Sequence, residues 1–327
     1  MVRHLVDQGF TVFAISWKNP DGRDRDLGMD DYERLGIRAA LEAIRRIVPN
    51  ARVHAAGYCL GGTLLALAAA GLARRSDDTL RSLTLMAAQT DFTDPGELAL
   101  FIDEGQVAFL ETLMGQRGYL DKRQMAGAFQ MLRSSDLVWS YRLTNQLLGE
   151  RLPMSDLMAW NADGTRLPLR MHSEYLRGLF LNNALARGEW MVDGRPVNLH
   201  DIRAPIFSVG TVQDHVAPWR SVFKLHSLAD TEHTFVLTAG GHNVGIVNPP
   251  GSALSSYRLR QWRPGDRLLG PDEWLAQTPS VAGSWWEAWV GWLKQRSTRR
   301  TAPPPMGAPE AGLAPLEAAP GTYVRQR

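Results

Sequence analysis

The sequence contains a single cysteine, Cys59, among its 327 residues. A lone cysteine excludes an intrachain disulfide and any metal site built from several thiolates. No apolar stretch reaches the roughly 18 residues that a membrane-spanning helix needs. The first residues also lack the pattern of a secretory signal, because they are amphipathic and include an acid. We therefore expect a cytoplasmic protein in which Cys59 is a free thiol and a candidate nucleophile.

An excess of charge of one sign is also lacking. The 36 Lys and Arg residues nearly balance the 34 Asp and Glu residues, which leaves a net charge of +2. This balance gives no electrostatic case for nucleic acid as a partner. The sequence has no cluster of metal-ligating side chains and no glycine-rich phosphate loop, so we expect neither a metal nor a bound cofactor. With 44% hydrophobic residues, the chain can bury one large core or two small domains.

The most informative stretch is Gly57-Tyr-Cys-Leu-Gly61, which ends a β-prone run and precedes an Ala- and Leu-rich run typical of a helix. This is the layout of the strand-to-helix turn written G-x-S-x-G in hydrolases, with cysteine in place of serine. We expect a strained backbone at Cys59, with Gly57 and Gly61 both required because side chains there would collide with backbone. The first helical N–H groups and Thr63 would lie beside the sulfur and favour the thiolate. The alternative is a buried structural cysteine between glycines that serve only the turn.

The surrounding chain alternates predicted strands with predicted helices. The residues up to Gly9 are typical of the end of a helix closed by glycine, and apolar spacing predicts a helix from 30 to 48. Continuous apolar runs, as in strands buried on both faces of a parallel sheet, occur at Thr11–Ser16, Val53–Tyr58, Leu83–Ala87, Pro205–Gly210 and His233–Leu237. The pattern predicts an α/β protein with a mostly parallel sheet.

After residue 91 the alternation of predicted strands and helices stops, and residues 92–200 contain little that is typical of a strand. Helical pieces are predicted at Phe101–Gly105, Asp136–Tyr141 and Leu157–Asn161. We expect residues 1–91 and 201–300 to form the core and residues 92–200 to form an inserted cap or lid over the site. The alternative is that the insertion only extends the core.

Two polar residues follow the later predicted strands, in an order that matches a known catalytic triad. Asp214 comes just after the strand at 205–210, and His242 comes just after the strand at 233–237. The order nucleophile, acid, histidine is that of the α/β-hydrolase triad. His242 would take the proton of Cys59, while Asp214 would hold the imidazole by its other nitrogen. His215 is a competing base, but it adjoins the acid and is expected to point elsewhere.

Several blocks together resemble those of the polyhydroxyalkanoate synthase family. The catalytic blocks are Gly57-Tyr-Cys-Leu-Gly-Gly62, Gly210-Thr-Val-Gln-Asp-His-Val-Ala-Pro-Trp219 and Gly241-His-Asn-Val-Gly-Ile-Val-Asn-Pro-Pro250. Further similar blocks are Val12-Phe-Ala-Ile-Ser-Trp-Lys-Asn-Pro-Asp21, Asp136-Leu-Val-Trp139, Ser284-Trp-Trp286 and Ala319-Pro-Gly-Thr-Tyr-Val324. The resemblance covers nearly the whole chain.

The resemblance implies an α/β-hydrolase fold, with Cys59, Asp214 and His242 in the catalytic positions. It implies an acyltransferase that joins (R)-3-hydroxyacyl groups from coenzyme A thioesters into a polyester, as a homodimer on cytoplasmic granules. Coenzyme A would be a released product. Similar family members carry an N-terminal domain and earlier strands that this sequence does not show. The backbone N–H of Leu60 is then the one oxyanion donor that can be assigned. Asn243 also departs from the apolar residue that many relatives have there.

The chemistry of cysteine favours acyl transfer over hydrolysis. Attack of a thiolate on a thioester exchanges one thioester for another, so the acyl group stays activated for a second nucleophile. The 3-hydroxyl of the next unit, deprotonated by His242, can then lengthen the chain. One alternative is a cysteine-dependent thioesterase or esterase of the same fold. Another is a weakly active, granule-associated partner protein.

The C-terminal part contains a tryptophan-rich helix and a low-complexity tail. Trp285, Trp286, Trp289 and Trp292 recur at helical spacing, which predicts that most of them are buried against the sheet. A helix that lies on a granule or membrane surface is the alternative, although few basic residues flank the aromatics. Residues 301–327 are rich in Pro and Ala, and we expect a linker there.

Overall fold

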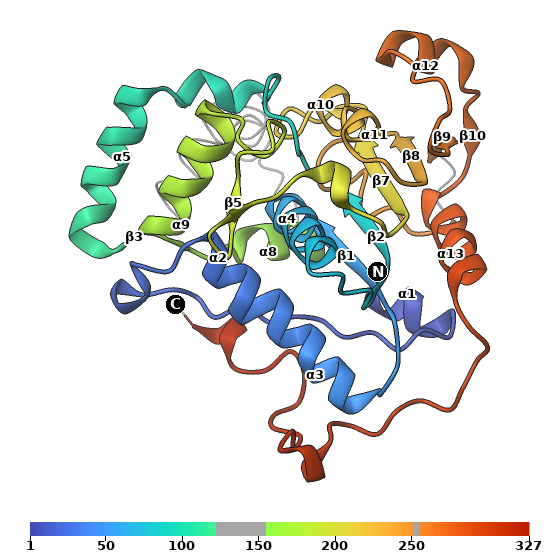
Figure 1. Cartoon of the computed structure of the whole chain (residues 1–327), viewed down its shortest axis with the longest axis horizontal. Helices are drawn as coiled ribbons and strands as arrows, with labels where there is room; N and C mark the ends of the chain where they lie inside the picture. The colour runs from blue at the N-terminus through green and yellow to red at the C-terminus, as the bar shows by residue number, and fades with distance from the viewer. Residues whose placement is uncertain (122–154, 252–254, 327) are drawn as a thin grey trace, which may run out of the picture.

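The structure is a computed structural model that describes residues 1–121, 155–251 and 255–326. Its centre is a six-stranded sheet in the order β1-β2-β7-β8-β9-β10. The strands are β1 (Val53–Tyr58), β2 (Leu80–Met86), β7 (Ile206–Thr211), β8 (His233–Thr238), β9 (Ser256–Trp262) and β10 (Val281–Ala282). The first four strands are parallel, while β9 and β10 are antiparallel to their neighbours. The α/β-hydrolase architecture expected from the sequence is confirmed (Figure 1).

Helices pack on both faces of this sheet. On one face α4 (Leu60–Arg74) is buried from Gly62 to Leu72, because its Ala- and Leu-rich sequence offers small apolar side chains on every side. On the other face α13 (Trp285–Arg296) buries all four of its tryptophans, as predicted. The shorter helices α10 (Trp219–Phe223) and α11 (Leu225–Leu228) connect β7 to β8, and α12 (Pro271–Gln277) connects β9 to β10. The two faces form separate apolar cores, one around α4 and one around α13.

The N-terminal part includes one confirmed and one wrong prediction. Helix α1 (Val2–Asp7) ends before Gly9, whose φ of 89° closes it. The predicted strand Thr11–Ser16 is not a strand: the segment has no regular secondary structure, and its large side chains Phe13 and Ile15 are 43% and 42% exposed. Its backbone makes no hydrogen bond with the described residues. A β-prone segment becomes a strand only when a neighbouring strand pairs with it, and no described strand does.

The predicted helix over residues 30–48 is confirmed as a continuous helical stretch. It consists of α2 (Met29–Tyr32), one π-helical segment η2 (Glu33–Arg38) and α3 (Ala39–Ile47). Trp17 stacks on Tyr32 at the start of this stretch, with ring centroids 5.3 Å apart.

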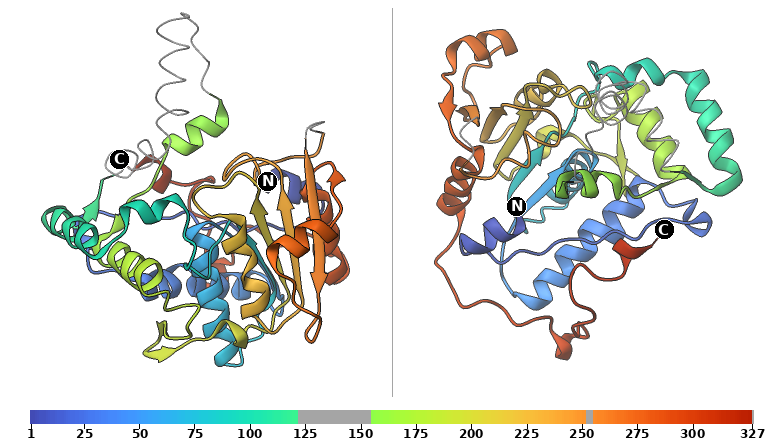
Figure 2. Two further views of the ribbon diagram at one scale, coloured as in Figure 1. Left: turned by 90° about the horizontal axis from the view of Figure 1, so that it is seen from above. Right: turned by 180° about the vertical axis from the view of Figure 1, so that it is seen from behind.

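Residues 92–200 add no strand to the central sheet among the described residues. Their helical segments are η3 (Glu97–Phe101), α5 (Glu104–Arg117), α8 (Asp156–Ala162), α9 (Leu169–Glu174), the π-helical η6 (Tyr175–Leu181) and η7 (Leu199–Asp201). Two short ribbons pair β3 (Tyr119–Leu120) with β4 (Leu167–Pro168), and β5 (Met191–Val192) with β6 (Arg195–Pro196). Helices α5 and α9 lie beside the sheet rather than across it (Figures 1 and 2). Leu157–Asn161 is helical as predicted, whereas Asp136–Tyr141 lies outside the described residues.

The last residues run back from α13 toward the N-terminal half (Figure 1). They contain two one-turn helices, η8 (Pro309–Ala311) and η9 (Tyr323–Arg325), whereas η1 (Gly22–Asp24) lies in the N-terminal loop before α2. The backbone N–H of Asn19 donates a 3.0 Å hydrogen bond to the side chain of Gln326, so the tail contacts the loop before α2. None of the described helices combines the length and the apolar character required to cross a membrane.

Candidate active site at the Cys59 elbow

Cys59 lies at the sharp turn between β1 and α4. Its φ of 52° and ψ of −126° place a non-glycine residue in a sparsely populated backbone region, as expected for a strained turn. The Cys59 N–H donates a 2.9 Å hydrogen bond to Met86 O, which ties the turn to β2. Its carbonyl accepts from the N–H groups of Gly62 and Thr63. These bonds hold the sulfur at the carboxyl edge of the parallel strands.

The glycines around the turn are not equivalent, and one of the two predictions about them is wrong. A Cβ on Gly57 would lie 2.5 Å from Gly61 O, so this glycine is required. A Cβ on Gly61 would meet nothing within 4 Å. The second close approach belongs instead to Gly62, where a Cβ would lie 2.4 Å from the Ala88 side chain. Gly61 points outward because it lies on the exposed side of the first helical turn.

The acid lies in the loop that follows β7. Asp214 is buried, and its Oδ1 accepts hydrogen bonds from the backbone N–H groups of Val216 (2.9 Å) and Ala217 (2.8 Å). Its Oδ2 accepts from Thr211 Oγ1 at 3.1 Å and lies 2.7 Å from His242 Nδ1. A carboxylate with four partners is fixed in orientation, so it fixes the imidazole as well.

His242 follows β8 and lies between the acid and the cysteine. Burial acts to lower the pKa of His242, but the hydrogen bonds to Asp214 and Cys59, together with their charges, outweigh it and raise the pKa to about 10. Because Nδ1 faces Asp214, the other ring nitrogen is the one available to Cys59. The structure thus brings Cys59, Asp214 and His242 together, in an arrangement that can form a thiolate next to an imidazolium.

The other histidines lie apart from this group. His215 Nδ1 is 2.8 Å from Glu97 Oε1, so it points away from His242, as expected. The remaining imidazoles have surroundings of their own: His4 beside Trp286, His54 beside Ser82 and Ser297, His172 in the core, His200 near Asp230, His226 against Phe223, and His233 beside Ser208. The described residues contain no group of three or more His, Cys, Asp or Glu side chains placed to hold a metal.

Several residues support His242 in a way that the sequence did not predict. Tyr58 Oη donates a 2.5 Å hydrogen bond to Asn243 Oδ1, and its ring lies 5.1 Å from the imidazole. The indole Nε1 groups of Trp285 and Trp286 donate 3.0 Å hydrogen bonds to the carbonyls of Gly245 and Ile246. The tryptophans of α13 therefore hold the loop that carries His242, in addition to filling the core.

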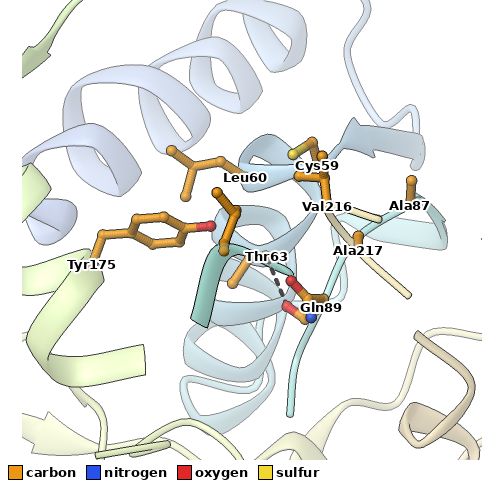
Figure 3. Close-up of a pocket in the computed structure, with 9 residues that line it drawn as sticks. Cys59, Leu60, Thr63, Ala87, Gln89, Tyr175, Val216 and Ala217 are labelled. Atoms are coloured by element: carbon orange, nitrogen blue, oxygen red, sulfur yellow. Dashed lines mark hydrogen bonds between the residues drawn. The ribbon is translucent and has the colours of Figure 1, made fainter. Parts of the chain in front are cut away.

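The described residues enclose a cavity of about 10 Å³ beside the sulfur, close to the volume that one water molecule needs. Figure 3 shows its lining, which consists of Cys59, Leu60, Thr63, Ala87, Gln89, Leu98, Tyr175, Val216 and Ala217. The Leu60 N–H, at the first position of α4, makes no hydrogen bond with the described residues. It is therefore available to a ligand atom in the cavity. Leu98 and Tyr175 come from the segment 92–200, so part of that segment lies beside the cysteine.

Comparisons with known proteins agree with this geometry. Residues 1–249 match the family model described as alpha/beta hydrolase fold. The chain is 43% identical over 326 residues to a poly(3-hydroxyalkanoate) polymerase subunit of Rhizobium meliloti, covering 100% of this chain and 52% of that protein. It is 40% identical over 328 residues to the poly(3-hydroxyalkanoate) polymerase of Methylorubrum extorquens, covering 100% and 53%.

A third relative is a poly(3-hydroxyalkanoate) polymerase subunit of Cupriavidus necator, 38% identical over 335 residues, with 100% of this chain and 56% of that protein covered. The chain spans about half the length of the curated relatives it matches. The match covers the whole of this chain, including the region of Cys59, Asp214 and His242. The chain therefore belongs to the α/β-hydrolase fold family and, within it, to the poly(3-hydroxyalkanoate) polymerase family.

Proposed function

We propose that this chain transfers (R)-3-hydroxyacyl groups from coenzyme A thioesters to a growing polyester through a covalent acyl-Cys59. The observation that carries the proposal is the 2.7 Å contact between Asp214 Oδ2 and His242 Nδ1, with the other side of the imidazole toward Cys59. The likeness to poly(3-hydroxyalkanoate) polymerases over the whole chain supports the same chemistry.

In the first half-reaction the Cys59 thiolate attacks the thioester carbonyl, and a new S–C bond forms. The tetrahedral intermediate collapses as the bond to the coenzyme A sulfur breaks, and the His242 imidazolium protonates the leaving thiolate. The Leu60 N–H is positioned to donate to the oxyanion. One thioester has replaced another, so the acyl group remains activated.

In the second half-reaction the 3-hydroxyl of another unit attacks the acyl-Cys59 carbonyl. An alcohol has almost no anion at neutral pH, so this step requires His242 as a general base, oriented by Asp214. An ester bond forms, the Cys59–acyl bond breaks, and the polyester is longer by one unit. Transfer to water would instead release a free acid. Exclusion of water therefore determines the outcome.

We infer that residues 92–200 act as a cap over the cysteine. The support is that Leu98 and Tyr175, which belong to this segment, line the cavity beside the Cys59 sulfur. The resemblance of the sequence to its family also leads us to propose a homodimer that works on the surface of cytoplasmic polyester granules.

The test is to incubate the chain with (R)-3-hydroxybutyryl coenzyme A and to follow coenzyme A release together with the acyl product. Polymer that appears with coenzyme A supports the proposal. Free 3-hydroxybutyrate in its place would make the chain a thioesterase. Cys59→Ala is the matched control, and coenzyme A release by that variant would remove Cys59 from the mechanism.

A further inference from the structure

Tyr175 reaches the site from outside the central sheet. It is the first residue of η6, directly after α9, and it belongs to the segment that lies beside the cysteine. Its ring meets Phe92 and Phe180 edge to face, with centroids 6.2 Å and 5.2 Å away. Edge-to-face contacts on two sides fix the plane of the ring. The hydroxyl is consequently held in one direction, toward the space beside Leu60 and Thr63 (Figure 3).

The hydroxyl of Tyr175 is a donor without an acceptor among the described residues. The other tyrosine near the site, Tyr58, already uses its hydroxyl on Asn243 Oδ1 and His242 O. Burial, with the charge of Cys59 as a second cause, raises the pKa of Tyr175 well above its usual value. The phenol therefore keeps its proton at neutral pH and can act only as a neutral donor or acceptor.

The cavity beside Cys59 places the Tyr175 hydroxyl close to the nucleophilic sulfur. Its volume of about 10 Å³ suits a single oxygen-sized group, and its lining includes the sulfur, the start of α4 and Tyr175. Leu60, whose backbone N–H is unused, and Tyr175 therefore both border the small space next to the sulfur. Two donors that converge beside a nucleophile are what the oxyanion of an acyl transfer requires.

We propose that Tyr175 is a catalytic residue that donates the second hydrogen bond, alongside the Leu60 N–H, to the oxyanion formed when Cys59 attacks a carbonyl. This inference rests on the proposed acyl transfer. As the Cys59 S–C bond forms, the carbonyl π electrons move to the oxygen, and the Tyr175 O–H contact strengthens. When the carbonyl re-forms and the leaving thiolate departs, the proton is still on Tyr175.

The test compares two probes of Cys59 in wild type and in Tyr175→Phe. A short alkyl trifluoromethyl ketone forms a tetrahedral adduct with an oxyanion, which fluorine NMR detects, whereas iodoacetamide alkylates the sulfur without forming an oxyanion. Removing one oxyanion donor typically costs about 10²–10³-fold, so ketone affinity should fall by about that factor. The rate of iodoacetamide alkylation should change by less than about threefold, because the thiolate and His242 are untouched.

Tyr119→Phe is the matched control, because Tyr119 lies under Arg166 and outside the cavity. This variant should keep the wild-type ketone affinity and the wild-type rate of iodoacetamide alkylation. A Tyr175→Phe protein that binds the ketone like wild type overturns the proposal. So does a variant with a lowered melting temperature that loses both probes together, because the hydroxyl would then act through packing. If wild type reacts with both probes yet releases no coenzyme A from 3-hydroxybutyryl coenzyme A, the proposed substrate is wrong and the oxyanion role stands.

Discussion

Trp285 Nε1 donates a 3.0 Å hydrogen bond to Gly245 O, three residues beyond His242. A buried indole on the last helix thus fixes the loop that positions the base. The same helix carries Trp289, whose Nε1 donates instead to Thr84 Oγ1 on β2 at 2.9 Å. The two tryptophans are equally buried and differ in what they hold.

This difference predicts different kinetics for Trp285→Phe and Trp289→Phe. Each variant loses a buried hydrogen bond, which costs about 1–3 kcal/mol of stability. Trp285→Phe should in addition lower kcat for coenzyme A release with little change in KM, because the His242 loop loses its tether. Trp289→Phe should keep the wild-type kcat. Equal effects of both variants on kcat would show that the tether does not position His242.

The glycines of the elbow predict opposite outcomes for two identical substitutions. Gly57→Ala places a Cβ 2.5 Å from Gly61 O, and overpacking against backbone should cost at least about 1–3 kcal/mol. Gly61→Ala meets no atom within 4 Å and lies in a helix, so stability should stay the same or rise by up to about 1 kcal/mol. Urea unfolding of both variants, with iodoacetamide labelling of Cys59, measures this. A Gly61→Ala protein as damaged as Gly57→Ala would contradict the geometry.

The charge state of His242 predicts a pH dependence of stability. Its pKa in the folded protein is raised to about 10, above the value near 6.5 of an unfolded chain. The folded state therefore holds the proton more tightly, and the stabilisation is complete below about pH 6.5 and is lost as pH rises through about 10. The difference in melting temperature between wild type and His242→Gln should shrink between pH 8 and pH 10.5. A difference in melting temperature that stays constant from pH 8 to pH 10.5 would contradict the raised pKa of His242.

Because the segment before α2 is exposed, we expect it to tolerate charged substitutions that a buried strand would not tolerate. Phe13→Lys and Ile15→Lys replace side chains that are 43% and 42% exposed, so each should change stability by no more than about 0.5 kcal/mol. Both should also reduce light scattering on heating, because an uncharged β-prone segment with unpaired backbone promotes aggregation. Leu83→Lys in β2 is the buried counterpart and should unfold the protein. A large loss of stability in the first two variants would mean that Thr11–Ser16 is packed in a sheet.

Most of the core could be predicted because the sequence of each strand and helix shows a local pattern of apolar residues. Strands β2, β7 and β8 are buried almost throughout, as their apolar and β-branched runs predict, whereas β1 (Val53–Tyr58) is at the edge of the sheet and is only half-buried. The same local signal made the prediction for Thr11–Ser16 wrong, because pairing depends on a neighbour that propensity does not report. Strand β9 was missed although its apolar positions alternate, with Tyr257 and Leu259 facing the α13 core.

The site was partly predictable for a similar reason. Cys59, Asp214 and His242 each follow a strand and stand out by residue type and order. The residues that support them do not stand out. Tyr175 belongs to no motif, and the tryptophan-rich pattern around Trp285 predicts only that it is buried. Only the fold brings Tyr175 to the cavity and the Trp285 indole to the His242 loop.

A rapid-quench experiment determines whether Cys59 carries the acyl group. The chain is mixed with (R)-3-hydroxybutyryl coenzyme A, quenched in acid within the first turnover, digested and analysed by mass spectrometry. The Cys59 peptide should gain one 3-hydroxybutyryl group as the first equivalent of coenzyme A appears. Coenzyme A release with an unmodified Cys59 peptide at every quench time would contradict this role of Cys59.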